Sequence, residues 1–166
     1  MRITHMILKL LGLKKKPPKT KIGKILRTTE RATQILILCY FIPFLFPQLL
    51  FGYSTSKHGI TLYTREPIPV EASHILDKIH AKLASSVLYD KDDTFRIFLC
   101  KTKAIYWLLS PLNRYGFASS YPLTDNIVVA RTNLSSNTSR TYRTTNKRFL
   151  SDVITHECGH VLIARR

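Results

Sequence analysis

Two histidines and a glutamate near the end of the chain have the spacing of a metal-dependent hydrolytic site. His156, Glu157 and His160 form the pattern His-Glu-x-x-His. Residues four apart lie on one face of a helix, so both imidazoles could bind one metal ion at roughly 2.0–2.1 Å. Glu157 is turned about 100° from His156, where it could take a proton from a water activated by the metal. The pattern thus predicts two ligands and a general base, and it lacks a third ligand.

The residues around this pattern favour a helix with one buried face. Apolar residues recur there at spacings of three, four, seven and eight, which is typical of such a helix. They are Phe149, Leu150, Val153, Ile154, Val161 and Leu162. Gly159 weakens a helix by about 1 kcal/mol relative to alanine, so we expect close packing or a functional approach there. The alternative is a buried helix whose two histidines are only hydrogen-bonded.

The pattern resembles that of the zincin metallopeptidases. The resemblance implies Zn²⁺ as the cofactor, His156 and His160 as its ligands, and Glu157 as the catalytic base. The longer metzincin pattern is not met, because Ile163 and Arg166 occupy its glycine and third-histidine positions. The chain is therefore more similar to the gluzincins, whose third ligand is a glutamate on a following helix. On this resemblance we expect the chain to be truncated after the motif helix.

Other residues are candidates for an additional metal ligand or for a disulfide bond. Asp152 lies one turn before His156 and could be the third ligand, as could a residue of a partner chain. His58, His74 and His80 are expected to be surface or hydrogen-bonded histidines. Cys100 and Cys158 could pair if their Cα atoms lie within about 7 Å, and two buried thiols are the alternative.

An uncharged segment near the start of the chain predicts a membrane anchor. Residues 32–56 contain no charged side chain, and residues 35–53 are apolar except for Gln48. Such a stretch spans about 28 Å as a helix, close to the thickness of a bilayer core. Residues 1–33 carry ten Lys and Arg against one acidic residue, which places them in the cytoplasm by the positive-inside rule.

We therefore expect three parts. Residues 1–33 form a basic cytoplasmic segment, residues 34–53 a transmembrane signal anchor, and residues 54–166 an extracytoplasmic domain. A buried soluble helix and a cleaved signal peptide are the alternatives for the apolar segment. The basic segment is expected on anionic lipid. No nucleic-acid partner is expected, because the basic segment lacks aromatic residues arranged for base stacking.

The remaining pattern predicts an α+β domain. Strands are expected at 60–64, 94–100 and 126–130, and helices at 70–89, at 103–109 and over the motif. This order is similar to the N-terminal half of a zincin, where a small mixed sheet backs the active-site helix. In that family an edge strand holds the substrate as an added strand. The candidate for that edge is Asn126, Ile127, Val128, Val129 and Ala130, with an ordinary core strand as the alternative.

The resulting hypothesis is a membrane-anchored zinc-dependent peptidase that hydrolyses peptides or proteins. The alternative is a catalytically inactive membrane protein whose ectodomain binds a partner. An intramembrane protease is disfavoured, because the motif lies about 100 residues from the apolar segment in a helix too polar for lipid.

Overall fold

The computed structural model describes residues 20–166. The chain divides into two compact units, of which the first ends at Pro43 and the second is Phe44–Arg166. The first part of the predicted basic segment, residues 1–19, lies outside the described residues. Residues 20–33 belong mainly to helix α2 (Lys21–Leu45).

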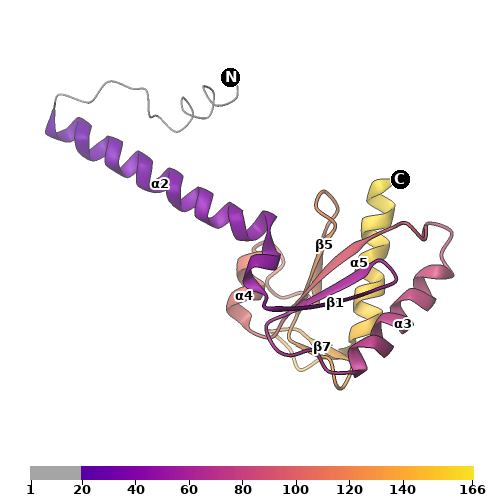
Figure 1. The fold of residues 1–166 in the computed structure, drawn as a ribbon. Coiled ribbons are helices and arrows are strands. Elements are labelled where there is room, and N and C mark those ends of the chain that lie inside the picture. Colours follow the sequence, from indigo (N-terminus) through magenta and orange to yellow (C-terminus); the bar gives the residue numbers. More distant parts are fainter. Residues whose placement is uncertain (1–19) are drawn as a thin grey trace. The chain divides into compact units, whose positions relative to one another are not determined.

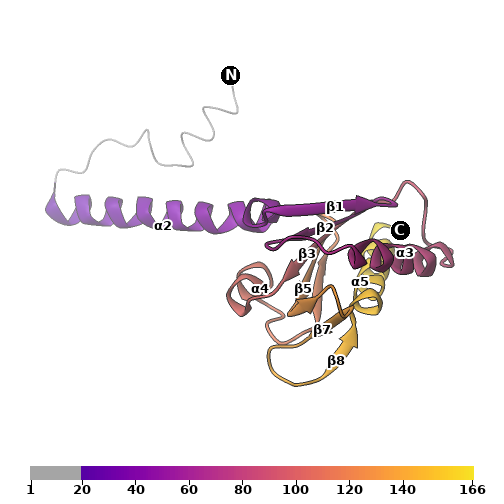
Figure 2. The ribbon, with the colours of Figure 1, turned by 60° about the horizontal axis from the view of Figure 1, so that its bottom comes forward.

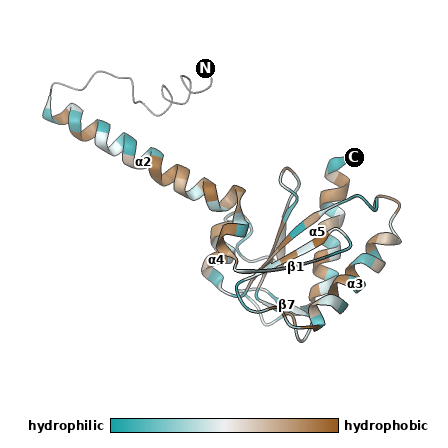
Figure 3. Cartoon of the chain, in the orientation of Figure 1, coloured by the Kyte–Doolittle hydropathy of each residue, from teal (hydrophilic) through white to brown (hydrophobic). Residues whose placement is uncertain are grey.

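The predicted transmembrane helix over 34–53 is wrong. Among the described residues, none of the helices combines the length and the apolarity needed to cross a membrane. The uncharged part of α2, residues 32–45, spans only about 21 Å, whereas a bilayer core is about 30 Å thick. Figure 3 shows the hydrophilic residues in the first turns of α2 and the hydrophobic ones toward its end.

The second half of the predicted anchor belongs to the folded domain. A 3-10 helix, η1 (Pro47–Leu50), follows α2 and has Pro47 in its first turn. Leu50 and Phe51 pack on the domain core, and the ring centroids of Phe51 and Phe98 are 5.3 Å apart. Tyr53 already begins strand β1. The single-pass localisation inferred from residues 34–53 therefore has no support in the structure.

A five-stranded mixed sheet forms the centre of the domain (Figure 1). Its strands are β1 (Tyr53–Lys57), β2 (Ile60–Thr64), β3 (Phe95–Cys100), β4 (Ala118–Tyr121) and β5 (Asn126–Ala130). Their spatial order is β1-β2-β3-β5-β4. β2, β3 and β5 are parallel, and β1 and β4 are antiparallel edge strands. The predicted α+β class is confirmed.

Helices cover both faces of this sheet (Figures 1 and 2). Helix α3 (Glu71–Ala84) and helix α5 (Leu150–Arg165) pack on one face, against alternate side chains such as Ile97 and Ile127. Helix α4 (Lys103–Leu109) packs on the other face, against Phe98 and Val128. Successive side chains along β3 and β5 therefore point to opposite faces of the sheet and enter two separate cores.

A second, three-stranded antiparallel sheet connects β5 to α5. It consists of β6 (Thr132–Asn133), β7 (Thr138–Arg140) and β8 (Lys147–Phe149), in that order. The sequence predicted only a polar run here. Because these strands are two or three residues long and mostly polar, they carry no hydrophobic alternation that a sequence pattern could reveal.

Candidate functional site

Helix α5 carries the His-Glu-x-x-His residues on the side turned away from the sheet. Its buried face is the one that the apolar spacing predicted, except that Phe149 precedes the helix as its N-cap and is 63% exposed. It consists of Leu150, Ser151, Val153, Ile154, Cys158, Val161 and Leu162. His156 and His160 are exposed, and Glu157 is half-buried between the two faces. The motif helix is therefore confirmed, and the two histidines are open to a ligand from outside.

The two imidazoles already lie at a separation that suits one metal ion. Their Nε2 atoms are 3.1 Å apart. Two nitrogens bound at 2.0–2.1 Å with a tetrahedral angle between them would be separated by about 3.3–3.4 Å. A shift of a few tenths of an ångström thus converts the observed pair into a bidentate site. The same distance also allows one ring to donate a hydrogen bond to the other, so the geometry fits either use.

Glu157 lies about 140° around α5 from Asp152, which forms an ion pair with Lys82 of α3. Glu157 is half-buried, between the exposed histidines and the buried face of the helix. Helix α5 also packs against β4. A general base at Glu157 would act on a substrate bound beside His160.

The start of α5 is held by a residue from another element. The N-cap residue of α5, Phe149, has no side-chain oxygen to cap the helix. Instead, Asn137 in the β6–β7 turn accepts hydrogen bonds from two amides of the first turn. Its carbonyl accepts from Leu150 N and its Oδ1 from Ser151 N, each at 3.0 Å. Its Nδ2 donates to Ser151 Oγ at 3.2 Å. Asn137 therefore acts as an external cap.

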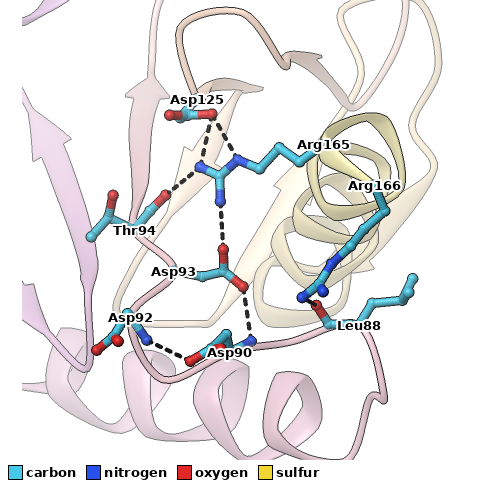
Figure 4. Close-up of polar contacts among 8 residues, drawn as sticks. All are labelled: Leu88, Asp90, Asp92, Asp93, Thr94, Asp125, Arg165 and Arg166. Atoms are coloured by element: carbon cyan, nitrogen blue, oxygen red, sulfur yellow. Dashed lines mark hydrogen bonds and ion pairs between the residues drawn. The ribbon is translucent and has the colours of Figure 1, made fainter.

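The end of α5 is held by a cluster around Arg165 (Figure 4). The guanidinium forms ion pairs with Asp93 at 2.7 Å and with Asp125 at 2.8 Å. It also donates to the Thr94 carbonyl at 3.0 Å and lies over the Phe95 ring. These partners precede β3 and β5, so Arg165 fastens the last turn of α5 to the amino ends of two central strands.

A third metal ligand is not provided by the described residues. Among them, no group of three His, Cys, Asp or Glu side chains could share a metal ion. Asp152 is engaged by Lys82. His58 Nε2 donates a hydrogen bond to the Asp77 carboxylate at 3.0 Å, and the His58 ring stacks on His80, as expected of a hydrogen-bonded histidine. Hydrogen bonds from Lys57 and then His58 lower the pKa of Asp77.

The predicted edge strand, Asn126–Ala130, lies inside the sheet. β5 is paired with β3 on one side and with β4 on the other, and all five of its residues are buried. It is the core strand that the sequence left as the alternative, and its backbone cannot accept an added strand. The edge strand beside α5 is β4, which contains two serines and no β-branched residue, so its sequence resembled a loop.

The outer side of β4 is only partly open to an added strand. Ala130 N donates to Phe117 O at 2.8 Å, so in the alternating antiparallel pattern Ala118 and Ser120 direct their backbone groups away from β5. The Ala118 carbonyl already accepts a hydrogen bond from Asn113 Nδ2 at 2.8 Å. Ser120 is therefore the position at which a substrate backbone could pair.

The two cysteines of the domain are free, buried thiols. The Cys100–Cys158 disulfide is thus not formed, and the alternative of two buried thiols is confirmed. Burial raises the pKa of both thiols. Cys158 faces the core, as its position on the helix predicted, and does not take part in the exposed site.

A pocket of about 540 Å³ lies elsewhere, at the carboxyl ends of β2 and β3. Arg65, Lys101, Asn133 and Phe51 are among the side chains that line it. None of the His-Glu-x-x-His residues contributes to it. The candidate site is therefore the histidine pair, because the imidazole nitrogens of α5 are the atoms that can bind a metal ion.

Comparisons with known proteins give no match: neither family models, nor curated proteins, nor solved structures resemble the chain significantly.

Proposed function

We propose that the chain is a zinc-dependent peptidase. The observation that carries this proposal is the 3.1 Å separation of the exposed His156 and His160 nitrogens on a helix packed beside an edge strand. Zinc, when bound, polarises a peptide carbonyl and lowers the pKa of a water molecule. His156 and His160 would hold it, and a donor outside the described residues would complete the set of three protein ligands.

The remaining chemistry belongs to residues of the chain. Glu157 would accept a proton from the attacking water at its carboxylate and pass that proton to the leaving amine. The open backbone groups of Ser120 would hold the substrate in an extended conformation, antiparallel or parallel to β4. These roles require that a water, a peptide and the Glu157 carboxylate meet on one flank of α5.

The decisive test separates the base from the ligands. We expect Glu157→Gln to retain bound zinc while hydrolysis of quenched fluorescent peptides falls at least about 100-fold. We expect His156→Ala to lose both zinc and hydrolysis. Zinc content after dialysis against limiting zinc is measured by atomic absorption.

His74→Ala provides the matched control, because His74 is an exposed histidine of α3 outside the motif. It should change neither zinc content nor hydrolysis. Full activity in the Glu157→Gln variant would exclude the proposed mechanism.

A second candidate function is a non-enzymatic binding protein. It is favoured by the lack of a third donor among the described residues, and by the hydrogen bond that His156 and His160 can form with each other. A wild-type protein that takes up no zinc and cleaves no peptide would contradict the peptidase and support this candidate.

A further inference from the structure

Cationic and aromatic side chains from three segments meet on the α4 side of the domain. We call this surface the basic aromatic face and define it by Lys103, Trp107, Arg114, Tyr115 and Arg143. Lys103 and Trp107 belong to α4, Arg114 and Tyr115 to the loop that follows α4, and Arg143 to the loop between β7 and β8. Figures 1 and 2 show α4 on the side of the sheet away from α3 and α5.

Ring contacts join these segments. Lys103 Nζ lies 4.1 Å from the Trp107 ring centroid, and the Arg114 guanidinium carbon lies 5.4 Å from it. The Trp107 and Tyr115 rings meet edge to face at 6.3 Å. Arg143 lies over Tyr115 at 5.6 Å. Three cations therefore lie over two neighbouring rings of this face.

The charge of this region has one sign. Between residues 101 and 149 there are eight basic residues, Lys101, Lys103, Arg114, Arg131, Arg140, Arg143, Lys147 and Arg148, and Asp125 alone is acidic. Asp125 is paired with Arg165 at the amino ends of the strands. The three cations of the basic aromatic face are exposed, and so is Tyr115 at 55%. The face thus offers cations without an acidic neighbour in its own segments.

We propose that the basic aromatic face binds single-stranded nucleic acid. Exposed Lys and Arg attract phosphates, and aromatic rings and guanidinium planes stack on unpaired bases. An acidic peptide would use the charges alone, whereas an unpaired base could also stack on the exposed Tyr115 ring or on a guanidinium plane. The expectation of no nucleic-acid partner was made for the whole chain, but it was argued from residues 1–33 alone. The basic aromatic face forms only in the folded domain, because its residues come from three segments that are separate in the sequence.

The single tryptophan of the chain, Trp107, lies within this face, which makes its fluorescence a direct reporter. Labelled dT20 and U20 oligonucleotides are titrated with the protein and followed by anisotropy and by Trp107 quenching. If three cations contact phosphates, the logarithm of the binding constant should fall against the logarithm of salt concentration with a slope of about −2.1. Tryptophan quenching that saturates with the anisotropy signal is expected if bases stack on the face.

Charge reversal locates the binding surface. Arg114→Glu with Arg143→Glu should weaken binding at least about tenfold and make the salt slope shallower by about 1.4. Lys78→Glu with Lys91→Glu makes the same change in charge at exposed positions outside the face and should have a much smaller effect. An equal loss of affinity in both variants would overturn the proposal.

Competition with polyglutamate tests the wild-type protein without any variant. Polyglutamate should displace dT20 poorly and leave Trp107 fluorescence unchanged. Displacement at an equal concentration of charges, with no quenching by either oligonucleotide, would show a general anion surface and overturn the proposal. Tighter binding of U20 than of dT20, or the reverse, would identify the kind of nucleic acid.

Discussion

Gly159 stands between the two candidate ligands and has no packing reason to be glycine. A Cβ built at this position would meet no neighbouring atom within 4 Å, so the close packing expected from the sequence is absent. The other expectation, a functional approach to the helix at this point, stays a prediction. Glycine in a helix is unfavourable relative to alanine because its backbone loses more conformational freedom on folding.

The variant Gly159→Ala tests whether a substrate approaches the helix at this position. We expect this variant to raise the free energy of unfolding by about 0.5–1 kcal/mol, measured by urea denaturation. If a substrate approaches the helix at Gly159, peptide hydrolysis should fall in the same variant although its stability rises. A loss of stability would instead mean that this helix turn cannot accept a Cβ.

At the scale of elements, α5 owes its position to residues outside it. Asn137 caps its first turn and Asp125 pairs with its last arginine. Both residues have positive φ angles, 46° for Asn137 and 54° for Asp125. Asn and Asp tolerate this left-handed region better than other residues with a Cβ. The chain therefore places these two residue types at turns whose geometry directs them toward the helix.

Removing the external cap should weaken the domain. Asn137→Ala is expected to lower the free energy of unfolding by about 1–2 kcal/mol, because the Ser151 amide loses its acceptor and the left-handed backbone becomes strained. Asn137→Asp keeps an acceptor for Ser151 N and adds a negative charge near the helix start. Its midpoint of thermal unfolding should therefore lie closer to the wild type. Equal midpoints for Asn137→Ala and the wild type would exclude the capping role.

At the scale of the molecule, the sequence predicted the elements that bury a regular apolar pattern. The strands at 60–64 and 126–130 and the helix at 103–109 agree with the structure in position and type. β4 was missed because its serines resemble a loop. Hydropathy alone predicted an anchor over residues 34–53. It does not reveal that Pro47 begins a separate turn, or that Phe51 packs on Phe98.

The candidate site was predictable only as far as it is local. The spacing of His156 and His160 follows from one helix, so the five residues 156–160 suffice to predict that the two imidazoles lie close together. The edge strand and the basic aromatic face depend on which distant segments become neighbours. Trp107 and Arg143 are 36 positions apart, and no periodicity relates them. Their proximity follows from the order of the strands, which local patterns do not determine.

The contacts at both ends of α5 restrict local opening of the helix that carries the motif. A helix normally frays from its termini, and its amide hydrogens exchange with solvent through such local openings. Here fraying requires breaking the Asn137 bonds at one end or the Arg165 cluster at the other. We expect amides of residues 156–160 to exchange in D₂O only at the rate of global unfolding. Arg165→Ala should open a faster local route from the last turn, while Arg166→Ala, which removes a single bond to Leu88, should not. The spacing of the two imidazoles would then persist for as long as the domain stays folded.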